Sequence, residues 1–439
     1  MIERLLTAAR RRTEAADVRW HRVERTTVSF ESGRLKACGL TEETGVNLRV
    51  VVEGRVGIAG STAQDHEELL ARALASAELG EALALELPTS APLAPLSTHA
   101  PRAAAASLDQ LAGLGRELVG RLDREGCQVN VSIEREIAET RVANSAGVDT
   151  QYAVTGVALG VDRTRFAGDD VLLMSDYYSG VDLPSEADLA ALVRSIEQRF
   201  APALRVVEPP EGVLPVVFTP AGLSAILLPL EQALSGKAVL QGISPLAGKL
   251  GEQVVDPRLS LTDDALVPGR PSSRPVDDEG VPSRVVALVE RGVVKQFVYD
   301  LETAARARTA STGHGSRGTF GKPHIGYSNL LVGNGKPGRT TGEGHFAGGL
   351  SESVADGLVI DDLIGVGQGN VIGGAFSHPV ALAYRVQRGE ITGRVKDAAV
   401  AGNVYELLKR IGGFGDDARW LGSRWAPSLL LEGVAVARR

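Results

Sequence analysis

Alternating apolar and polar residues, in runs that end at short glycine turns, constrain this chain most strongly. In the stretch TGVNLRVVVEGRVGIAGST, Val46, Leu48, Val50 and Val52 alternate with other residues, and Glu53-Gly54 supplies a turn. A period of two is typical of a strand with one buried face. The chain also has 51 glycines and only 4% aromatic residues, a composition that favours many turns between strands. We therefore expect a fold rich in antiparallel sheet.

The first half of the chain mixes such strands with helices. Ser107 and Gln110 form a capping box that begins one helix, and Ser185 is the expected N-cap of another. A stretch rich in proline and alanine, 86–107, reads as a surface linker. The expected helices are 1–16, 63–83, 107–126 and 184–200, and the expected hairpin turns are 31–33 and 144–147. This order predicts one α+β domain over residues 1–205.

From residue 212 onward, glycine and proline turns interrupt short apolar runs. Two-residue turns at Arg291-Gly292 and Arg388-Gly389 indicate antiparallel pairing. Helices are expected only at 221–235 and 399–411. The whole chain is thus expected to be α+β, with a mainly antiparallel, sandwich-like or barrel-like domain over residues 212–439.

Composition excludes several classes of protein. The net charge is −7 and no dense block of lysine and arginine occurs, which argues against a nucleic acid ligand. The N-terminal stretch lacks an apolar signal core, and no apolar run is long enough for a membrane span. Cys38 and Cys127 are isolated, which suits a reducing compartment. We expect a cytoplasmic protein.

Sequence motifs that are typical of catalytic or phosphate-binding sites are absent or weak. The sequence has no GxSxG elbow and no P-loop, and GVGQGN (365–370) is better interpreted as a turn. His314, His324, His345 and His378 lie in the C-terminal half, where they would have to meet in space to bind a metal. Three acidic clusters are expected in solvated loops, although a pair of acids can also perform acid–base chemistry. These clusters are 263–264, 277–279 and 361–362.

One apolar helix raises a specific question. The stretch AILLPLEQALSG (225–236) follows a strand-like run and carries Glu231 and Gln232, without a metal ligand pair or a nucleophile–base pair. Pro229 removes an N–H group, so the helix is expected to kink or to start late. From the residues alone, the chain is a two-domain protein without an identified active site.

Several segments, in the same order and at similar spacing, resemble the TldD/PmbA family. They are ESGRLKACGLTEETGVNLRVVVEGRVGIAGST, DDEGVPSRVVALVERGVVKQFVYDLETAAR, STGHG followed by GKPHIGYSNLLVGNG, and GNVIGGAFSHPVALAYRVQRGEITGRVKDAAVAGNVYELLKRI. The likeness covers residues 20–435. It implies a family in which two related chains work together as a metal-dependent peptidase.

In that family, the TldD-type chain carries an HExxxH helix and a further cysteine ligand, and the PmbA/TldE-type chain lacks both. The helix comparable to the metal helix is 225–236, and the ligand positions fall on or near Leu228, Pro229 and Ala233. None of these side chains binds zinc. The resemblance therefore implies a non-catalytic, metal-free TldE-type subunit of a heterodimer, with zinc on the TldD-type partner.

The resemblance also points to a groove for an extended peptide, which would be bound largely through its backbone. The family is associated with the degradation of small unfolded proteins and with the removal of leaders from peptide antibiotics. The candidate groove residues are Tyr327, Ser328, Asn329, Gly373, Gly374 and Phe376. The alternative is a purely structural role, in which Ser328 and Asn329 cap a turn and Phe376 fills the core.

Two other functions stay open at this point. The chain could be an enzyme with a site of its own, drawn from residues such as His324, His345, His378, Asp361 and Glu390. It could also be a homodimeric peptide-binding protein without catalysis. Bound metal or activity on the isolated chain would favour the first, and a stable homodimer in the presence of the sister chain would favour the second.

Overall fold

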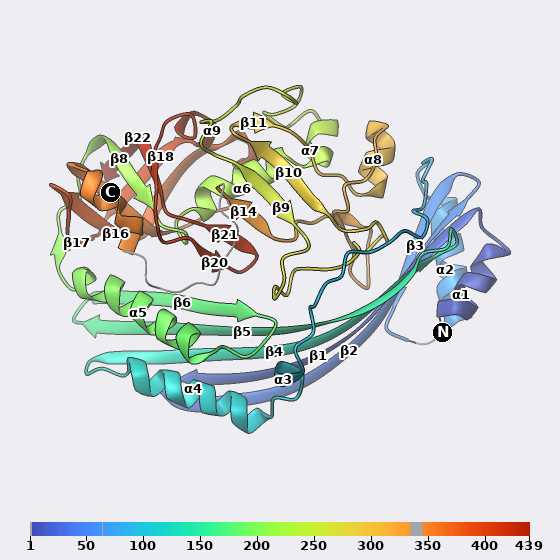
Figure 1. Cartoon of the computed structure of the whole chain (residues 1–439), viewed down its shortest axis with the longest axis horizontal. Coiled ribbons are helices and arrows are strands. Elements are labelled where there is room, and N and C mark those ends of the chain that lie inside the picture. The colour runs from blue at the N-terminus through green and yellow to red at the C-terminus, as the bar shows by residue number, and fades with distance from the viewer. Residues whose placement is uncertain (1, 64, 334–345) are drawn as a thin grey trace.

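A large antiparallel sheet forms the N-terminal half of the computed structural model, which describes residues 2–63, 65–333 and 346–439. Its six strands follow the order β3-β2-β1-β4-β5-β6, and the central four are 17 to 19 residues long (Figure 1). The bounds are β1 Ala15–Glu31, β2 Arg34–Val52, β3 Arg55–Ser61, β4 Cys127–Asn144, β5 Asp149–Ala167 and β6 Asp170–Gly180. The expected turns at 31–33, 53–54 and 144–147 all join neighbouring strands of this sheet.

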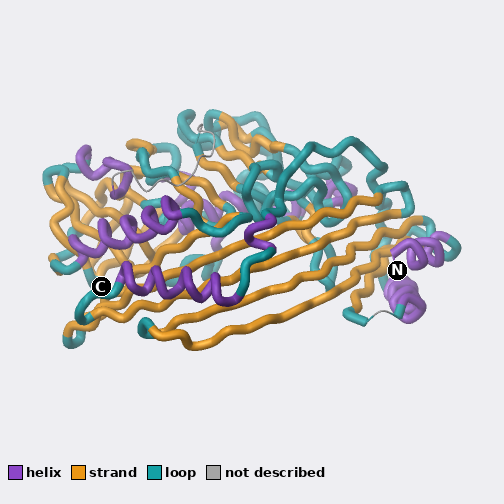
Figure 2. The backbone as a smooth tube through the Cα atoms, turned by 60° about the horizontal axis from the view of Figure 1, so that its bottom comes forward, coloured by secondary structure: helices purple, strands orange, loops and turns teal. Residues whose placement is uncertain are grey.

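Helices cover parts of this sheet, and Figure 2 shows the long strands running beneath them. α1 and α2 pack against β1–β3 at one end, where Leu48 and Leu69 are buried in a shared core. The predicted capping box at Ser107 and the predicted N-cap at Ser185 are both confirmed, and Ser185 forms a full capping box with Asp188. The bounds are α1 Ile2–Arg10, α2 His66–Glu78, α3 Pro101–Ala104, α4 Leu108–Leu122 and α5 Glu186–Ala203.

The proline- and alanine-rich stretch mostly lacks regular structure. It runs along the molecule from the end that holds α2 toward α3 and α4 (Figure 1). Contrary to the expectation of an irregular linker throughout, Pro101–Ala104 forms the short helix α3, which begins with Pro101 at a position where the missing N–H group costs nothing.

The C-terminal half lies against one side of the long sheet (Figure 1). Its described residues form two large sheets and one two-stranded sheet. The larger follows the order β15-β8-β22-β18-β16-β17-β7, with β19 paired to β22, and a further pairing of β15 with β16 closes part of it into a barrel-like ring. Its strands are β7 Val206–Val207, β8 Gly212–Phe218, β15 Asp356–Leu363, β16 Ala375–Gln387, β17 Glu390–Val395, β18 Ala398–Asn403, β19 Ile411–Phe414 and β22 Leu429–Arg438.

The smaller sheet follows the order β11-β10-β9-β14-β21-β20, and β12 and β13 form a separate pair. These strands are β9 Leu261–Asp264, β10 Val285–Glu290, β11 Val293–Val294, β12 Gly315–Ser316, β13 His324–Ile325, β14 Leu330–Val332, β20 Arg419–Leu421 and β21 Arg424–Ala426. The C-terminal helices are α6 Ser224–Ala233, α7 Gly236–Leu240, α8 Leu301–Ala307 and α9 Val404–Leu407, with 3-10 segments η1 Phe346–Ser353 and η2 Val371–Gly373. The α+β class is confirmed.

The predicted helix at 399–411 is wrong. Residues Ala398–Asn403 form β18, which is hydrogen-bonded between β16 and β22, and only Val404–Leu407 is helical. Sheet pairing on both sides satisfies the backbone of this segment and so overrides its local helical pattern. Asn403 then caps the short helix through bonds from the N–H groups of Tyr405 and Glu406.

In the described part of the chain, no helix has the length and apolar character needed to cross a membrane.

Candidate functional site

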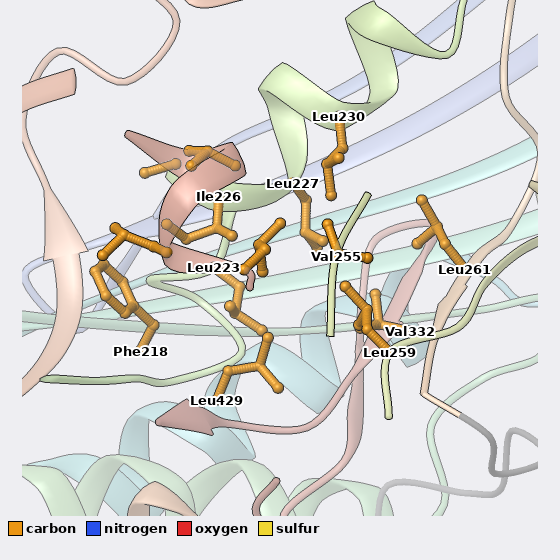
Figure 3. Close-up of a cluster of buried hydrophobic side chains, with 14 of the residues drawn as sticks. Phe218, Leu223, Ile226, Leu227, Leu230, Val255, Leu259, Leu261, Val332 and Leu429 are labelled. Atoms are coloured by element: carbon orange, nitrogen blue, oxygen red, sulfur yellow. The ribbon is translucent and has the colours of Figure 1, made fainter. Parts of the chain in front are cut away.

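Helix α6 lies in the middle of the C-terminal core. Leu223, Ile226, Leu227 and Leu230 pack against Phe218 of β8 and against strands of both C-terminal sheets (Figure 3). All are at most 2% exposed. The helix begins at Ser224, three residues later than predicted, and continues through Pro229. Apolar packing on most sides therefore fixes the position of this helix.

The remaining side of α6 borders a cleft of about 380 Å³. Leu228 and Pro229 line it, whereas Ala233 is fully buried in the core. The carboxylate of Glu231 is held by Arg424, with Nε–Oε1 and Nη2–Oε2 distances of 2.7 and 2.9 Å. Zinc needs about four nitrogen, sulfur or carboxylate donors in a tetrahedral arrangement. The side chains that α6 presents to the cleft are hydrocarbon, so this donor set does not fit the ion.

The opposite wall of the cleft consists of the first part of β16 and of the turn at residues 364–368. Phe376 and His378 both line the cleft, and their rings stack with centroids 5.8 Å apart. Burial lowers the pKa of His378, so its imidazole is neutral at pH 7. An aromatic surface without a formal charge therefore faces the apolar side of α6.

The backbone of β16 also faces this cleft. The carbonyl of Gly374 accepts the N–H of Val404 on the β18 side, at 2.8 Å, and the carbonyl of Pro379 accepts the N–H of Ile364 on the opposite side, at 2.9 Å. Backbone groups of successive strand residues alternate in direction. The N–H and C=O groups of Ser377 therefore point away from β18 and toward the cleft, where an extended peptide can pair with them.

The structure separates the six predicted groove residues. Phe376 lines the cleft, and Gly373 and Gly374 form the turn that leads into β16. Gly374 has a φ of +77° and a Cβ there would lie 2.5 Å from the Tyr405 ring, so only glycine fits. Ser328 and Asn329 are interior residues, and the Tyr327 hydroxyl donates to the carbonyl of Glu231 at 2.6 Å. No sequence pattern marks Ser377, because its contribution is the direction of its backbone N–H and C=O groups.

The residues considered for a separate active site are dispersed. His314 is buried and its Nε2 lies 3.1 Å from Asp263, whereas His324 and Glu390 are exposed in other strands. Asp361 pairs with Arg199, with 2.8 Å between Oδ2 and Nη1. His345 lies outside the described residues. Among the residues that are described, no group of three or more histidine, cysteine, aspartate or glutamate side chains has a metal-binding arrangement.

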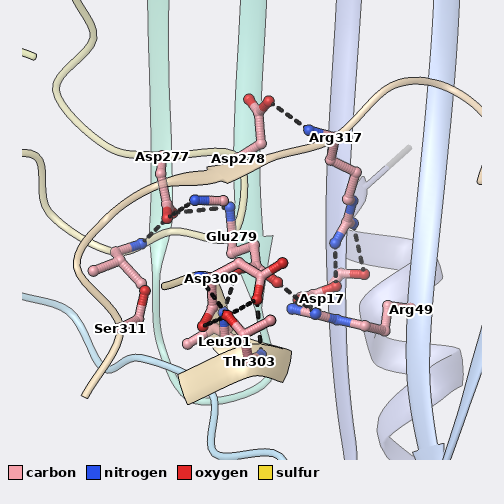
Figure 4. A network of polar contacts seen from close by, with 12 residues as sticks. Asp17, Arg49, Asp277, Asp278, Glu279, Asp300, Leu301, Thr303, Ser311 and Arg317 are labelled. Atoms are coloured by element: carbon pink, nitrogen blue, oxygen red, sulfur yellow. Dashed lines mark hydrogen bonds and ion pairs between the residues drawn. The ribbon is translucent and has the colours of Figure 1, made fainter. Parts of the chain in front are cut away.

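The expectation that the acidic clusters lie in solvated loops is wrong for most of their residues; Asp362 is exposed, but it lies in strand β15. Asp263 and Asp361 are buried in strands β9 and β15, and Asp277, Asp278 and Glu279 are buried where the C-terminal half meets the long sheet (Figure 4). Buried carboxylates need compensating partners. Several of these partners come from distant segments that no local pattern reveals, among them Arg49 for Glu279, Arg199 for Asp361 and His314 for Asp263.

Arg49 is the centre of this network. It lies opposite Asp17 in the β1–β2 register, bonds to that carboxylate, and also donates from Nη1 to Glu279 of the C-terminal half at 2.6 Å. Arg317 reaches back from the C-terminal half to Asp17, with 2.7 Å between Nη1 and Oδ1. The face of β2 opposite its apolar side is thus buried too, although the alternation predicted a strand with one solvated face. We name Asp17, Arg49, Glu279 and Arg317 the interdomain ion network.

Asp277 should give the stability a distinct pH dependence. Burial, and secondarily the charge of Glu279, raises the pKa of Asp277 to about 7, well above the ordinary value of an aspartate. A carboxyl whose pKa is raised in the folded state stabilises that state below its unfolded pKa, and the contribution is lost as the pH rises. We expect the unfolding free energy of wild type, relative to Asp277→Asn, to fall between pH 4 and 7. Urea titrations across this range measure the difference, and a constant difference would contradict the assignment.

The sequence of this chain is similar to those of known proteins. Residues 211–438 match the family model described as PmbA/TldA metallopeptidase C-terminal domain, and residues 16–78 match PmbA/TldA metallopeptidase domain 1. A Methanothermobacter thermautotrophicus protein named metalloprotease is 26% identical over 93% of this chain and 89% of its own length. A Haemophilus influenzae metalloprotease TldD homolog is 30% identical over 47% of this chain and 42% of its own.

The fold is also similar to a solved structure. The crystal structure of TldE from Thermococcus kodakarensis superposes with a TM-score of 0.89 at 24% identity, covering 99% of both chains. A metalloprotease PmbA homolog of Haemophilus influenzae is 27% identical over 51% of this chain and 46% of its own. The arrangement of both halves is therefore shared with a known structure over nearly the full length.

Proposed function

Since the chain belongs to the TldD/PmbA family of metallopeptidases, we propose that it is the metal-free subunit of a two-chain peptidase that acts on extended peptides. One observation carries the proposal. Helix α6 is packed in the core of the C-terminal half, but Leu228, Pro229 and Ala233 occupy the positions comparable to the metal ligands. A helix selected only for packing needs no donors, and a catalytic zinc helix does.

The α6 cleft, defined by α6, the turn 364–368 and the start of β16, is proposed as a peptide-binding surface. Its chemistry supports an extended peptide, because strand pairing to Ser377 recognises backbone, and Phe376 with Leu228 offers apolar contact to side chains. Such recognition depends little on the sequence of the peptide. It therefore suits unfolded segments or peptide precursors.

Zinc and the groups that activate water are proposed to reside on the TldD-type partner, which acts together with this chain in the cytoplasm. Cys38 and Cys127 are free thiols, which is consistent with a reducing compartment. The role of this chain is then to hold peptide and to support the partner, and not to perform the chemical step. No nucleic acid or membrane is part of the proposal.

Peptidase activity should require the partner. We expect no turnover of an unstructured peptide by this chain alone, turnover by the mixture with the TldD-type chain, and loss of that turnover on chelation with recovery on addition of zinc. Mass spectrometry of the cleaved peptide measures each case. Metal-dependent turnover by this chain alone would instead support an active site of its own.

A further inference from the structure

A second and larger cavity lies between the two halves of the chain. Its volume is about 810 Å³, and its walls come from β6, α5, β20 and the loop 268–270. It shares no lining residue with the α6 cleft. Four aromatic side chains, Tyr177, Tyr178, Phe346 and Trp420, lie in its wall together with several charged residues. Neither the family resemblance nor the proposed peptide cleft uses this space.

Arg270 in the wall of this cavity is a buried cation that has no anionic partner among residues 2–63, 65–333 and 346–439. Its side chain is 7% exposed in the folded chain. Nη1 donates to the carbonyl of Ser179 at 2.6 Å and Nη2 to that of Gly422 at 2.5 Å, while the guanidinium carbon lies 4.1 Å from the ring centroid of Trp420. Nε has no hydrogen-bond partner. Within the described residues, no carboxylate pairs with Arg270.

The other buried or partly buried arginines of the same wall are paired with carboxylates. Arg199 pairs with Asp361 at 2.8 Å, Arg394 pairs with Asp170 at 2.6 Å, and Arg419 pairs with Asp176. A buried charge is costly unless it is paired, and a guanidinium stays protonated at any physiological pH. Burial lowers the pKa of Arg270 to about 10, which still leaves it charged at neutral pH. The wall therefore holds one buried cation for which the described residues supply no carboxylate partner.

We propose that this cavity binds a peptide through its C-terminal carboxylate, with Arg270 as the receptor for that group. The guanidinium is a planar fork that matches a carboxylate, and stacking on Trp420 fixes its plane. The aromatic wall offers apolar contact for the residues that precede the terminus. This site is independent of the α6 cleft and of the proposed subunit role.

The charge of the wall favours a carboxylate over a phosphate. Seven aspartates and five arginines line the cavity among the described residues, so its overall charge is negative in spite of Arg270. A phosphate or nucleic acid would bring two or more negative charges into this environment and would be repelled. A single carboxylate brings only one negative charge, and it brings that charge to Arg270, which has no carboxylate partner among the described residues.

Calorimetry on the full chain tests the site. The probes are acetyl-Ala-Ala-Ala with a free carboxylate, the same peptide as its C-terminal amide, acetyl-Ala-Asp-Ala amide and inorganic phosphate. We expect the free acid to bind at least about tenfold tighter than the amide, because a charge-assisted hydrogen bond is lost in the amide. We expect Arg270→Met to remove this preference. Arg102→Met is the matched control, since it removes a wall arginine that is largely exposed, and it should retain the preference.

Measurements on wild type alone can overturn the proposal, whether or not the variant folds. Equal affinity for the acid and the amide would do so, and so would the absence of binding of either at millimolar concentration. Retention of the preference in folded Arg270→Met would overturn the role of Arg270. Phosphate binding tighter than the free acid would overturn the ligand class, and equal binding of the aspartate peptide would overturn the assignment to a chain terminus.

Discussion

Replacing Arg49 by methionine should lower the free energy of unfolding by about 3–5 kcal/mol, because it removes one partner of a buried ion network and leaves buried carboxylates without compensation. Arg49 is 3% exposed and is bonded to both Asp17 and Glu279. Methionine keeps most of the volume, so the loss reports charge and hydrogen bonds more than packing. Chemical denaturation followed by circular dichroism measures the change.

The pH dependence of this variant identifies the cause. Arg49 lowers the pKa of Glu279, whereas burial, the largest influence, raises it. Without Arg49 the pKa of Glu279 rises further, and a folded-state carboxyl with a raised pKa is stabilising only at low pH. The loss of stability in Arg49→Met should therefore be smaller at pH 5 than at pH 8.

Arg22→Met is the matched control for this experiment. Arg22 lies on the same strand as Asp17 and pairs with Glu42, but both side chains are about half exposed, at 45% and 52%. Exposed ion pairs contribute less than about 1 kcal/mol. If Arg49→Met were no more destabilising than Arg22→Met, the interdomain ion network would not stabilise the contact between the two halves.

Replacing Phe376 by alanine should lower peptide turnover by the reconstituted pair about tenfold, since loss of a large aromatic contact to a bound ligand costs on the order of 1–2 kcal/mol. Phe376 lines the α6 cleft and stacks on His378. The mass of the heterodimer should stay unchanged, because the cleft and not the interface is altered. Turnover of an unstructured peptide and a native mass spectrum give the two readouts.

Phe320→Ala is the control for the cleft. Phe320 is 65% exposed and does not line the α6 cleft, so its removal should leave turnover as in wild type. Unchanged turnover in Phe376→Ala would mean that the ring serves the core, against which it also packs. A loss that accompanied dissociation of the pair would likewise speak against a peptide-binding role.

Local signals predicted the elements that depend on neighbouring residues. The capping boxes at Ser107 and Ser185 fix the starts of α4 and α5, because a cap and its helix are only three residues apart. Two-residue turns such as Arg291-Gly292 likewise join the predicted strands. The prediction of a helix at 399–411 was wrong because the first residues of this segment pair with β16 and β22, whose positions local signals do not report.

In the candidate site, too, the sequence predicted some residues correctly and missed those that depend on distant parts of the chain. Resemblance pointed to Phe376, and the structure places it at the α6 cleft, whereas neighbouring candidates such as Ser328 belong to the interior. The acidic cluster 277–279 was expected in water because two of its arginine partners, Arg19 and Arg49, are more than 200 residues away. Periodicity reports which residues are apolar, but it does not report which polar residues find partners inside.

A native mass spectrum of the tagged chain, purified from cells that also make the TldD-type chain, tests the subunit role most directly. The account predicts one copy of each chain and a single zinc ion, which remains with the partner when the two chains are separated. Zinc retained on this chain after separation would contradict it. So would a metal-free homodimer formed in the presence of the TldD-type chain, which would instead indicate a peptide-binding protein without catalysis.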